Sequence, residues 1–181
     1  AIGPADDGSP WFLAIDHPGV IAEYKAASAG PPPGRFQAAY AFATRAQLHE
    51  GLNRVFHLAR SVPDYPLKAF LEETGHLGET EGERLLRQRR GQDRFRAALL
   101  DYWQFRCPLS GVAEPRLLRA SHIVPWALCE SDAQRLDVHN GLLLAAHLDA
   151  AFDSGLASFD DSGALLLKDE LGSAEIGLLD A

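Results

Sequence analysis

The chain of 181 residues lacks the features that define several common protein classes. It has no methionine and only two cysteines, Cys107 and Cys129, which supply neither a disulfide framework nor a four-cysteine zinc site. No apolar run reaches the about 18 residues of a membrane-spanning helix, and no basic segment followed by an apolar one opens the chain. These absences exclude a transmembrane protein and favour a cytoplasmic one, whether Ala1 begins a processed chain or a fragment.

The composition is that of a folded globular chain, with 46% hydrophobic and 9% aromatic residues, and it excludes disorder throughout. The formal net charge of −8 by itself argues against binding to nucleic acid. The charge is unevenly distributed, however, because residues 84–119 contain nine arginines and only three acidic residues. Arginine matches phosphate oxygens well, so this segment predicts either a phosphate-binding surface or a solvated helix face.

The first part of the chain has the composition of an extension and a linker. Residues 1–35 are rich in Gly, Pro, Ala and Ser, and the segment GPPPG at 30–34 indicates an extended linker. Within this part, residues 10–24 predict a short strand or an irregular packed segment.

Helical patterns follow the linker. Residues 36–60 place apolar side chains at helical spacing, and Pro66 is suited to begin a second helix. Thr80 and Glu83 form the capping-box pattern of a third helix. We expect Gly91 to interrupt that helix before the helical period resumes.

The second half of the chain has the texture of an α+β unit. Residues 117–126 predict a strand, residues 127–139 a polar loop, and residues 140–145 a tight turn that leads into a second strand. A brief helix at 146–155 and a hairpin at 156–167 follow. We therefore expect an α+β fold with a helical N-terminal part.

Several blocks of the second half resemble the HNH endonucleases, which are ββα-metal nucleases, in the branch found in bacterial restriction-type proteins. The blocks include ASHIVPW, RLDVHNGLLL and HLDAAFD, and the resemblance extends over residues 88–168. It implies an HNH nuclease domain at 92–181, preceded by a helical region at 36–91 and an extension with linker at 1–35.

The residues of these blocks suit phosphodiester hydrolysis with one metal ion. A neutral histidine can take a proton from water near pH 7, which favours His122 as the general base. Asp149 and Asp153 are four residues apart on the expected helix, so their carboxylates share a face that suits a divalent metal, Mg²⁺ or Mn²⁺. The resemblance assigns Asn140, nine residues before Asp149, to bracing the loop that presents His122.

The chain departs from the literal family pattern at two positions. Asp149 fills the third histidine position, which favours Mg²⁺ or Mn²⁺ over a zinc-like ion. Ser121, directly before the general base, is a poor metal ligand. His147 is the alternative last histidine of the motif, but it is turned about 200° away from Asp149 on a helix. For His139 we weigh a plain turn residue against a phosphate contact.

The resemblance favours duplex DNA as the partner of the arginine segment. Contacts to the DNA backbone are independent of sequence and sensitive to salt. Because one such site cuts one strand, cleavage of both strands would require a homodimer or two successive nicks. The arginines expected to contact phosphate are Arg84, Arg87, Arg89, Arg90, Arg94, Arg96 and Arg119.

The sequence therefore predicts a metal-dependent DNA endonuclease, and the resemblance implies a role in restriction or defence against foreign DNA. One alternative is a catalytically decayed HNH module that only binds DNA, with Ser121 as the first sign of decay. Another is a structural or interaction domain that never meets nucleic acid.

Overall fold

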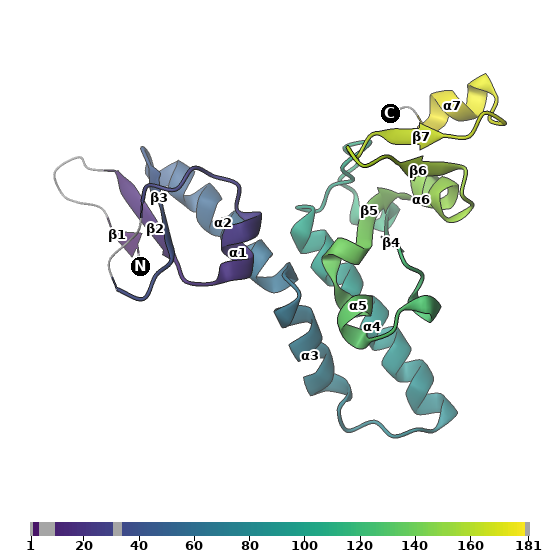
Figure 1. The fold of residues 1–181 in the computed structure, drawn as a ribbon, viewed down its shortest axis with the longest axis horizontal. Coiled ribbons are helices and arrows are strands. Elements are labelled where there is room, and N and C mark those ends of the chain that lie inside the picture. Colours follow the sequence, from purple (N-terminus) through teal and green to yellow (C-terminus); the bar gives the residue numbers. More distant parts are fainter. Residues whose placement is uncertain (1, 4–9, 31–33, 180–181) are drawn as a thin grey trace.

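The computed structural model describes residues 2–3, 10–30 and 34–179 (Figure 1). Most of the linker predicted at 30–34 lies outside the described residues. The N-terminal part, the paired helices that follow it and the C-terminal part succeed one another along the chain (Figure 1). In the described part of the chain, no helix combines the length and the apolar character needed to cross a bilayer.

The N-terminal part is a small antiparallel sheet packed against two helices. The sheet has the order β1-β2-β3, and its core contains the buried side chains of Leu13, Tyr40 and Leu58. Its elements are β1 (Ile2–Gly3), β2 (Trp11–Ile15), α1 (Pro18–Glu23), β3 (Ala38–Phe42) and α2 (Arg45–Ser61). The alternative of a short strand within residues 10–24 is confirmed, and a short helix follows that strand.

The expected helix at 36–60 is wrong in its first part, where the chain forms β3. This strand pairs with β2 over five positions, from Trp11 opposite Phe42 to Ile15 opposite Ala38. The helix begins only at Arg45, because the Thr44 side chain accepts a hydrogen bond from the Gln47 N–H and fixes the start there. Pairing with β2 thus overrides a helical spacing that the segment also satisfies.

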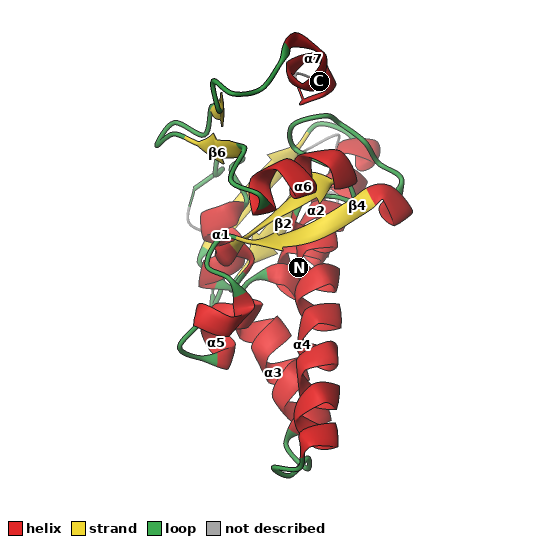
Figure 2. Cartoon of the chain, turned by 90° about the vertical axis from the view of Figure 1, so that its right-hand side faces the viewer, coloured by secondary structure: helices red, strands yellow, loops and turns green. Residues whose placement is uncertain are grey.

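Two helices, α3 (Asp64–Thr74) and α4 (Glu81–Tyr102), lie side by side (Figure 2). The capping box of Thr80 and Glu83 is confirmed at the start of α4. The expected interruption at Gly91 is wrong, since α4 continues through it. Glycine costs about 1 kcal/mol in a helix, and the burial of Phe95 and Leu99 one and two turns later outweighs that cost. The division proposed between residues 91 and 92 falls inside this helix.

The C-terminal part confirms the expected order of strand, loop, strand, helix and hairpin. Strands β4 and β5 pair antiparallel, with Leu118 opposite Ala145 and His122 opposite Gly141. Helix α6 lies across this pair (Figure 2). The elements are β4 (Leu118–His122), α5 (Asp132–Leu136), β5 (Gly141–Ala145), α6 (Ala146–Asp153), β6 (Ala157–Phe159), β7 (Leu165–Leu167) and α7 (Ser173–Leu179). Neither α5 nor α7 was expected from the sequence.

Strand β4 ends at His122 rather than at residue 126. Two residues after His122, the backbone N–H of Val124 donates to the Asn140 side chain instead of to a neighbouring strand. Pro125 then has no N–H to offer to such a strand. The loop after His122 is therefore held by a side chain.

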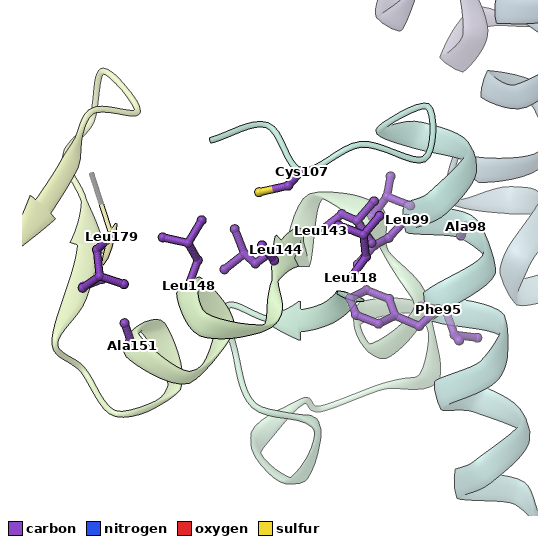
Figure 3. Packing of buried hydrophobic residues seen from close by; sticks show 14 of the residues in the cluster. Phe95, Ala98, Leu99, Cys107, Leu118, Leu143, Leu144, Leu148, Ala151 and Leu179 are labelled. Carbon is purple, nitrogen blue, oxygen red and sulfur yellow. The ribbon is translucent and has the colours of Figure 1, made fainter. Parts of the chain in front are cut away.

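One hydrophobic core joins α4 to the β4–β5 pair and to α6 (Figure 3). Phe95 of α4, Leu118 of β4, Leu143 and Leu144 of β5 and Leu148 of α6 are all buried in it. The α+β class expected from the sequence is confirmed. Because α4 supplies part of this core, the helix and the C-terminal part pack as one unit.

Polar contacts attach the N-terminal part to the end of α4. The Tyr102 hydroxyl donates to Glu23 at 2.7 Å, and Arg54 Nη1 donates to the Tyr102 carbonyl at 2.7 Å. Glu23 also meets His139 Nε2 at 3.1 Å. His139 directly precedes Asn140, so this junction touches the turn that carries the motif asparagine.

Candidate active site

His122 lies at the end of β4, where its imidazole is held by a main-chain carbonyl. Its Nε2 is 2.9 Å from the Arg135 carbonyl oxygen. A carbonyl only accepts hydrogen bonds, so Nε2 carries the proton in the neutral ring. Nδ1 is then the nitrogen with a free lone pair. The backbone thus selects the tautomer that leaves Nδ1 available as a base.

The surroundings of His122 favour its neutral form. Burial lowers the pKa of His122, and the hydrogen bond to the Arg135 carbonyl opposes this only in part. A base must be unprotonated before the reaction, so a lowered pKa keeps it ready at neutral pH. The environment therefore prepares this ring to accept a proton.

Asn140 connects the segments on either side of the loop that follows His122. Its Oδ1 accepts from the Val124 N–H at 2.8 Å, and its Nδ2 lies 3.3 Å from the Val124 carbonyl. The same Nδ2 donates to the Gln134 carbonyl at 3.1 Å. Asn140 is buried, so its amide replaces water for these three main-chain groups.

Asp149 is joined to the end of β4 through Ser121. The Ser121 side chain is buried and its hydroxyl donates to a carboxylate oxygen of Asp149. Asp149 lies in the first turn of α6, and Asp153 is the last residue of that helix and is exposed. Ser121, adjacent to His122, thus links the strand of the candidate base to the helix of the candidate metal carboxylates.

The donor set suits a hard cation that keeps much of its water. Among the described residues, no three His, Cys, Asp or Glu side chains gather into a metal-binding group. Mg²⁺ is commonly held by one or two carboxylates, several waters and substrate phosphates. The half-buried Asp149, with Asp153 one turn further on, offers such a set of oxygens. The described residues thus offer no cluster of three or more such ligands for a zinc site closed by the protein alone.

The other two histidines of the motif lie apart from this donor set. His147 is on α6, two residues before Asp149, and is half-buried. His139 lies in a short 3₁₀ turn, and its two ring nitrogens meet Asp137 at 2.9 Å and Glu23 at 3.1 Å. Burial lowers the pKa of His139, but these carboxylates raise it more. With both nitrogens engaged, His139 has none to offer to a phosphate.

Several of the predicted phosphate-binding arginines make contacts within the chain. Arg96 donates to the carbonyls of Leu118 and Pro115 at 2.8 and 2.6 Å and so fixes the start of β4. Arg94 forms an ion pair with Glu73. Others do likewise: Arg87 pairs with Asp132 at 3.2 Å and Arg90 donates to the Glu73 carbonyl at 3.5 Å.

Arg84, Arg89 and Arg119 are the exposed members of the set. Arg84 Nε donates to the Glu79 carbonyl at 2.9 Å, and Arg119 Nη1 donates to the Arg116 carbonyl at 3.0 Å. In the part of the chain that the structure describes, Arg89 has no hydrogen-bond or ion-pair partner. The structure therefore separates arginines that support the fold from arginines that face solvent.

The groups that surround His122 could not be identified from the sequence. Its imidazole stacks on Phe95 of α4 and meets the edge of Trp126. Its hydrogen-bond acceptor is a main-chain carbonyl, which carries no residue-type signal. Only the packing of α4 against β4 could reveal these contacts.

Two strands and a helix, with a histidine at the end of the first strand and carboxylates on the helix, make up a ββα unit. Residues 107–160 match the family model described as HNH endonuclease. The matched segment contains β4, β5 and α6 and begins after α4. No curated protein matches the chain.

Proposed function

We propose that this protein is a divalent-metal-dependent DNA endonuclease in which His122 is the general base. The observation that carries the proposal is the hydrogen bond from His122 Nε2 to the Arg135 carbonyl, since it leaves Nδ1 free to take a proton. The family match over residues 107–160 supports phosphodiester hydrolysis as the chemistry. DNA is accordingly the expected substrate.

In the proposed reaction, His122 Nδ1 removes a proton from a water molecule whose oxygen attacks phosphorus. The new P–O bond forms as the bond to the 3′-oxygen breaks, and the leaving oxygen takes a proton from solvent. Asn140 holds the Val124 backbone and thereby the position at which His122 leaves β4. Ser121 holds one oxygen of Asp149 and orients the carboxylate.

Asp149 and Asp153 would hold the metal ion, Mg²⁺ or Mn²⁺. When bound, the ion supplies positive charge against the negative charge that gathers on the phosphate and on the leaving oxygen. A bound cation would partly offset the acidic balance of residues 120–181, which contain eleven acidic and two basic residues.

The test is incubation of supercoiled plasmid with the full chain and either Mg²⁺ or Mn²⁺. We expect nicking that EDTA abolishes and that excess Mg²⁺ restores. Nicking that survives EDTA would contradict the metal-dependent mechanism, and DNA binding without cleavage in any metal would favour the decayed module. The ratio of nicked to linear product, measured against protein concentration, tests the homodimer.

Exposed arginines on α4 are proposed to contact the DNA backbone. We expect Arg89→Gln to reduce the slope of log affinity against log salt by about 0.9, the value for one lost phosphate contact. The measurement is duplex binding in EDTA at several salt concentrations. Arg45→Gln on α2, an exposed arginine outside the proposed surface, is the matched control. An unchanged slope for Arg89→Gln would remove this residue from the interface.

The biological setting is part of the same proposal. The resemblance to restriction-type HNH proteins supports a role in defence against foreign DNA, which such an enzyme would meet in the cytoplasm. An acidic surface outside the arginine segment would repel DNA and limit nonspecific binding.

A further inference from the structure

The His122 imidazole is enclosed by two aromatic rings from different segments. Phe95 of α4 stacks on it with ring centroids 3.7 Å apart and an interplanar angle of 17°. Trp126, in the short 3₁₀ turn Trp126–Leu128, meets it edge-on with centroids 5.7 Å apart and an angle of 87°. The His122 imidazole therefore has three contacts: a stacked Phe95 ring, an edge-on Trp126 ring, and a hydrogen bond from Nε2 to the Arg135 carbonyl.

Two glycines leave the space that these rings occupy. A Cβ atom at Gly91 would lie 2.3 Å from Cη2 of Trp126. A Cβ atom at Gly141, which pairs with His122 across the strands, would lie 2.3 Å from Cζ of Phe95. Such distances are far below van der Waals contact, so neither position accepts a side chain without moving an aromatic ring. The packing of Trp126 thus explains why a glycine stands at position 91 inside α4.

Arg135 contacts both Trp126 and His122. Its guanidinium lies 5.7 Å from the Trp126 ring, and its Nε donates to the Trp126 carbonyl at 3.2 Å. The same residue accepts the His122 hydrogen bond through its own carbonyl. A shift of Trp126 would therefore also shift the carbonyl that selects the tautomer of His122.

Several charged groups on the neighbouring elements are engaged away from His122. On α4, Arg94 pairs with Glu73 and Arg96 donates to main-chain carbonyls. On α5, Asp132 pairs with Arg135 at 3.0 Å and also with Arg87. In the described part of the chain, no carboxylate is within hydrogen-bond distance of the His122 ring. The Phe95 and Trp126 rings are therefore the main side-chain contacts of the His122 imidazole.

We propose that Phe95 and Trp126 are positioning residues that hold the His122 imidazole in the plane from which Nδ1 faces the substrate. This rests on the proposed role of His122 as the base. Phe95 also belongs to the core, but hydrophobic burial alone would be met equally by an aliphatic side chain, which offers no flat surface to orient a ring. A geometry error of about 1 Å at a reacting group can cost up to about 10²-fold in rate.

The test compares Phe95→Leu with Phe70→Leu, a phenylalanine of the same core that is equally buried and lies on α3. We expect Phe95→Leu to lower kcat by about tenfold or more with little change in KM. We also expect the NMR titration of the His122 ring to move toward the pKa of an ordinary histidine, because water gains access to the ring. The pH–rate profile would move to higher pH accordingly. Phe70→Leu would reduce stability without these changes.

Trp126→Leu provides a second measurement, since Trp126 is half-buried and its loss is expected to leave the fold intact. Equal effects of Phe95→Leu and Phe70→Leu on kcat and on the His122 titration would overturn the proposal, as would an unchanged titration in Trp126→Leu. The titration needs no catalysis, so it is independent of the proposed function. Activity retained in a His122 variant would instead refute that function.

Discussion

His122→Ala is expected to reduce the rate of plasmid nicking by about 10²–10⁴-fold, the contribution usual for a positioned general base. The structure gives the reason in the hydrogen bond that protonates Nε2 and leaves Nδ1 basic. Since burial lowers the pKa of His122, its neutral form persists to lower pH than in an ordinary histidine. The nicking rate of the unmodified protein should therefore rise with pH and level off at a pH below the usual pKa of histidine. This rise should be absent in His122→Ala.

The control for this prediction is His49→Ala, which removes an exposed histidine from α2. Duplex binding in EDTA should be unchanged in both variants, because neither histidine belongs to the proposed arginine surface. A His122→Ala protein that nicks plasmid at the original rate would exclude this residue as the base. Circular dichroism of both variants establishes that the fold is retained.

The second large effect is expected from Asp149→Asn, with a loss of at least about 10²-fold in Mg²⁺-dependent nicking. The amide keeps the shape of the side chain and its Oδ1 can still accept the hydrogen bond from Ser121, so the substitution removes charge with little change in packing. A neutral amide is a much weaker ligand for a hard cation than a carboxylate. The measurement is Mn²⁺ binding by calorimetry, alongside the nicking rate.

Comparison with Asp153→Asn separates the roles of the two carboxylates. Asp153 is exposed at the end of α6, and we expect a smaller reduction in Mn²⁺ affinity than for Asp149→Asn. Asp161→Asn, in the exposed turn between β6 and β7, is the control. Unchanged Mn²⁺ binding in both Asp149→Asn and Asp153→Asn would refute the proposed metal site.

The strands of the C-terminal part could be predicted because their sequence signals agree with their environment. An alternating segment pairs with an apolar one after a tight turn, and burial of one face supports the same choice. Residues 38–42 could not be assigned correctly, because their apolar spacing suits a helix and a strand equally well. The pairing with β2, which comes from a segment more than twenty residues earlier, decided between them.

The sequence by itself determined the α+β class and the order of strand, strand, helix and hairpin in the C-terminal part, and it pointed to His122, Asn140 and Asp149 as candidates, because these signals lie in residue types and short spacings. Tertiary structure alone decided how each candidate is held. The base is oriented by a main-chain carbonyl and by the ring of Phe95, a residue of α4 more than twenty positions earlier in sequence. It also divided the arginines into those that brace the fold and those that face solvent. A guanidinium has the same charge in both settings, so only its neighbours in space distinguish them.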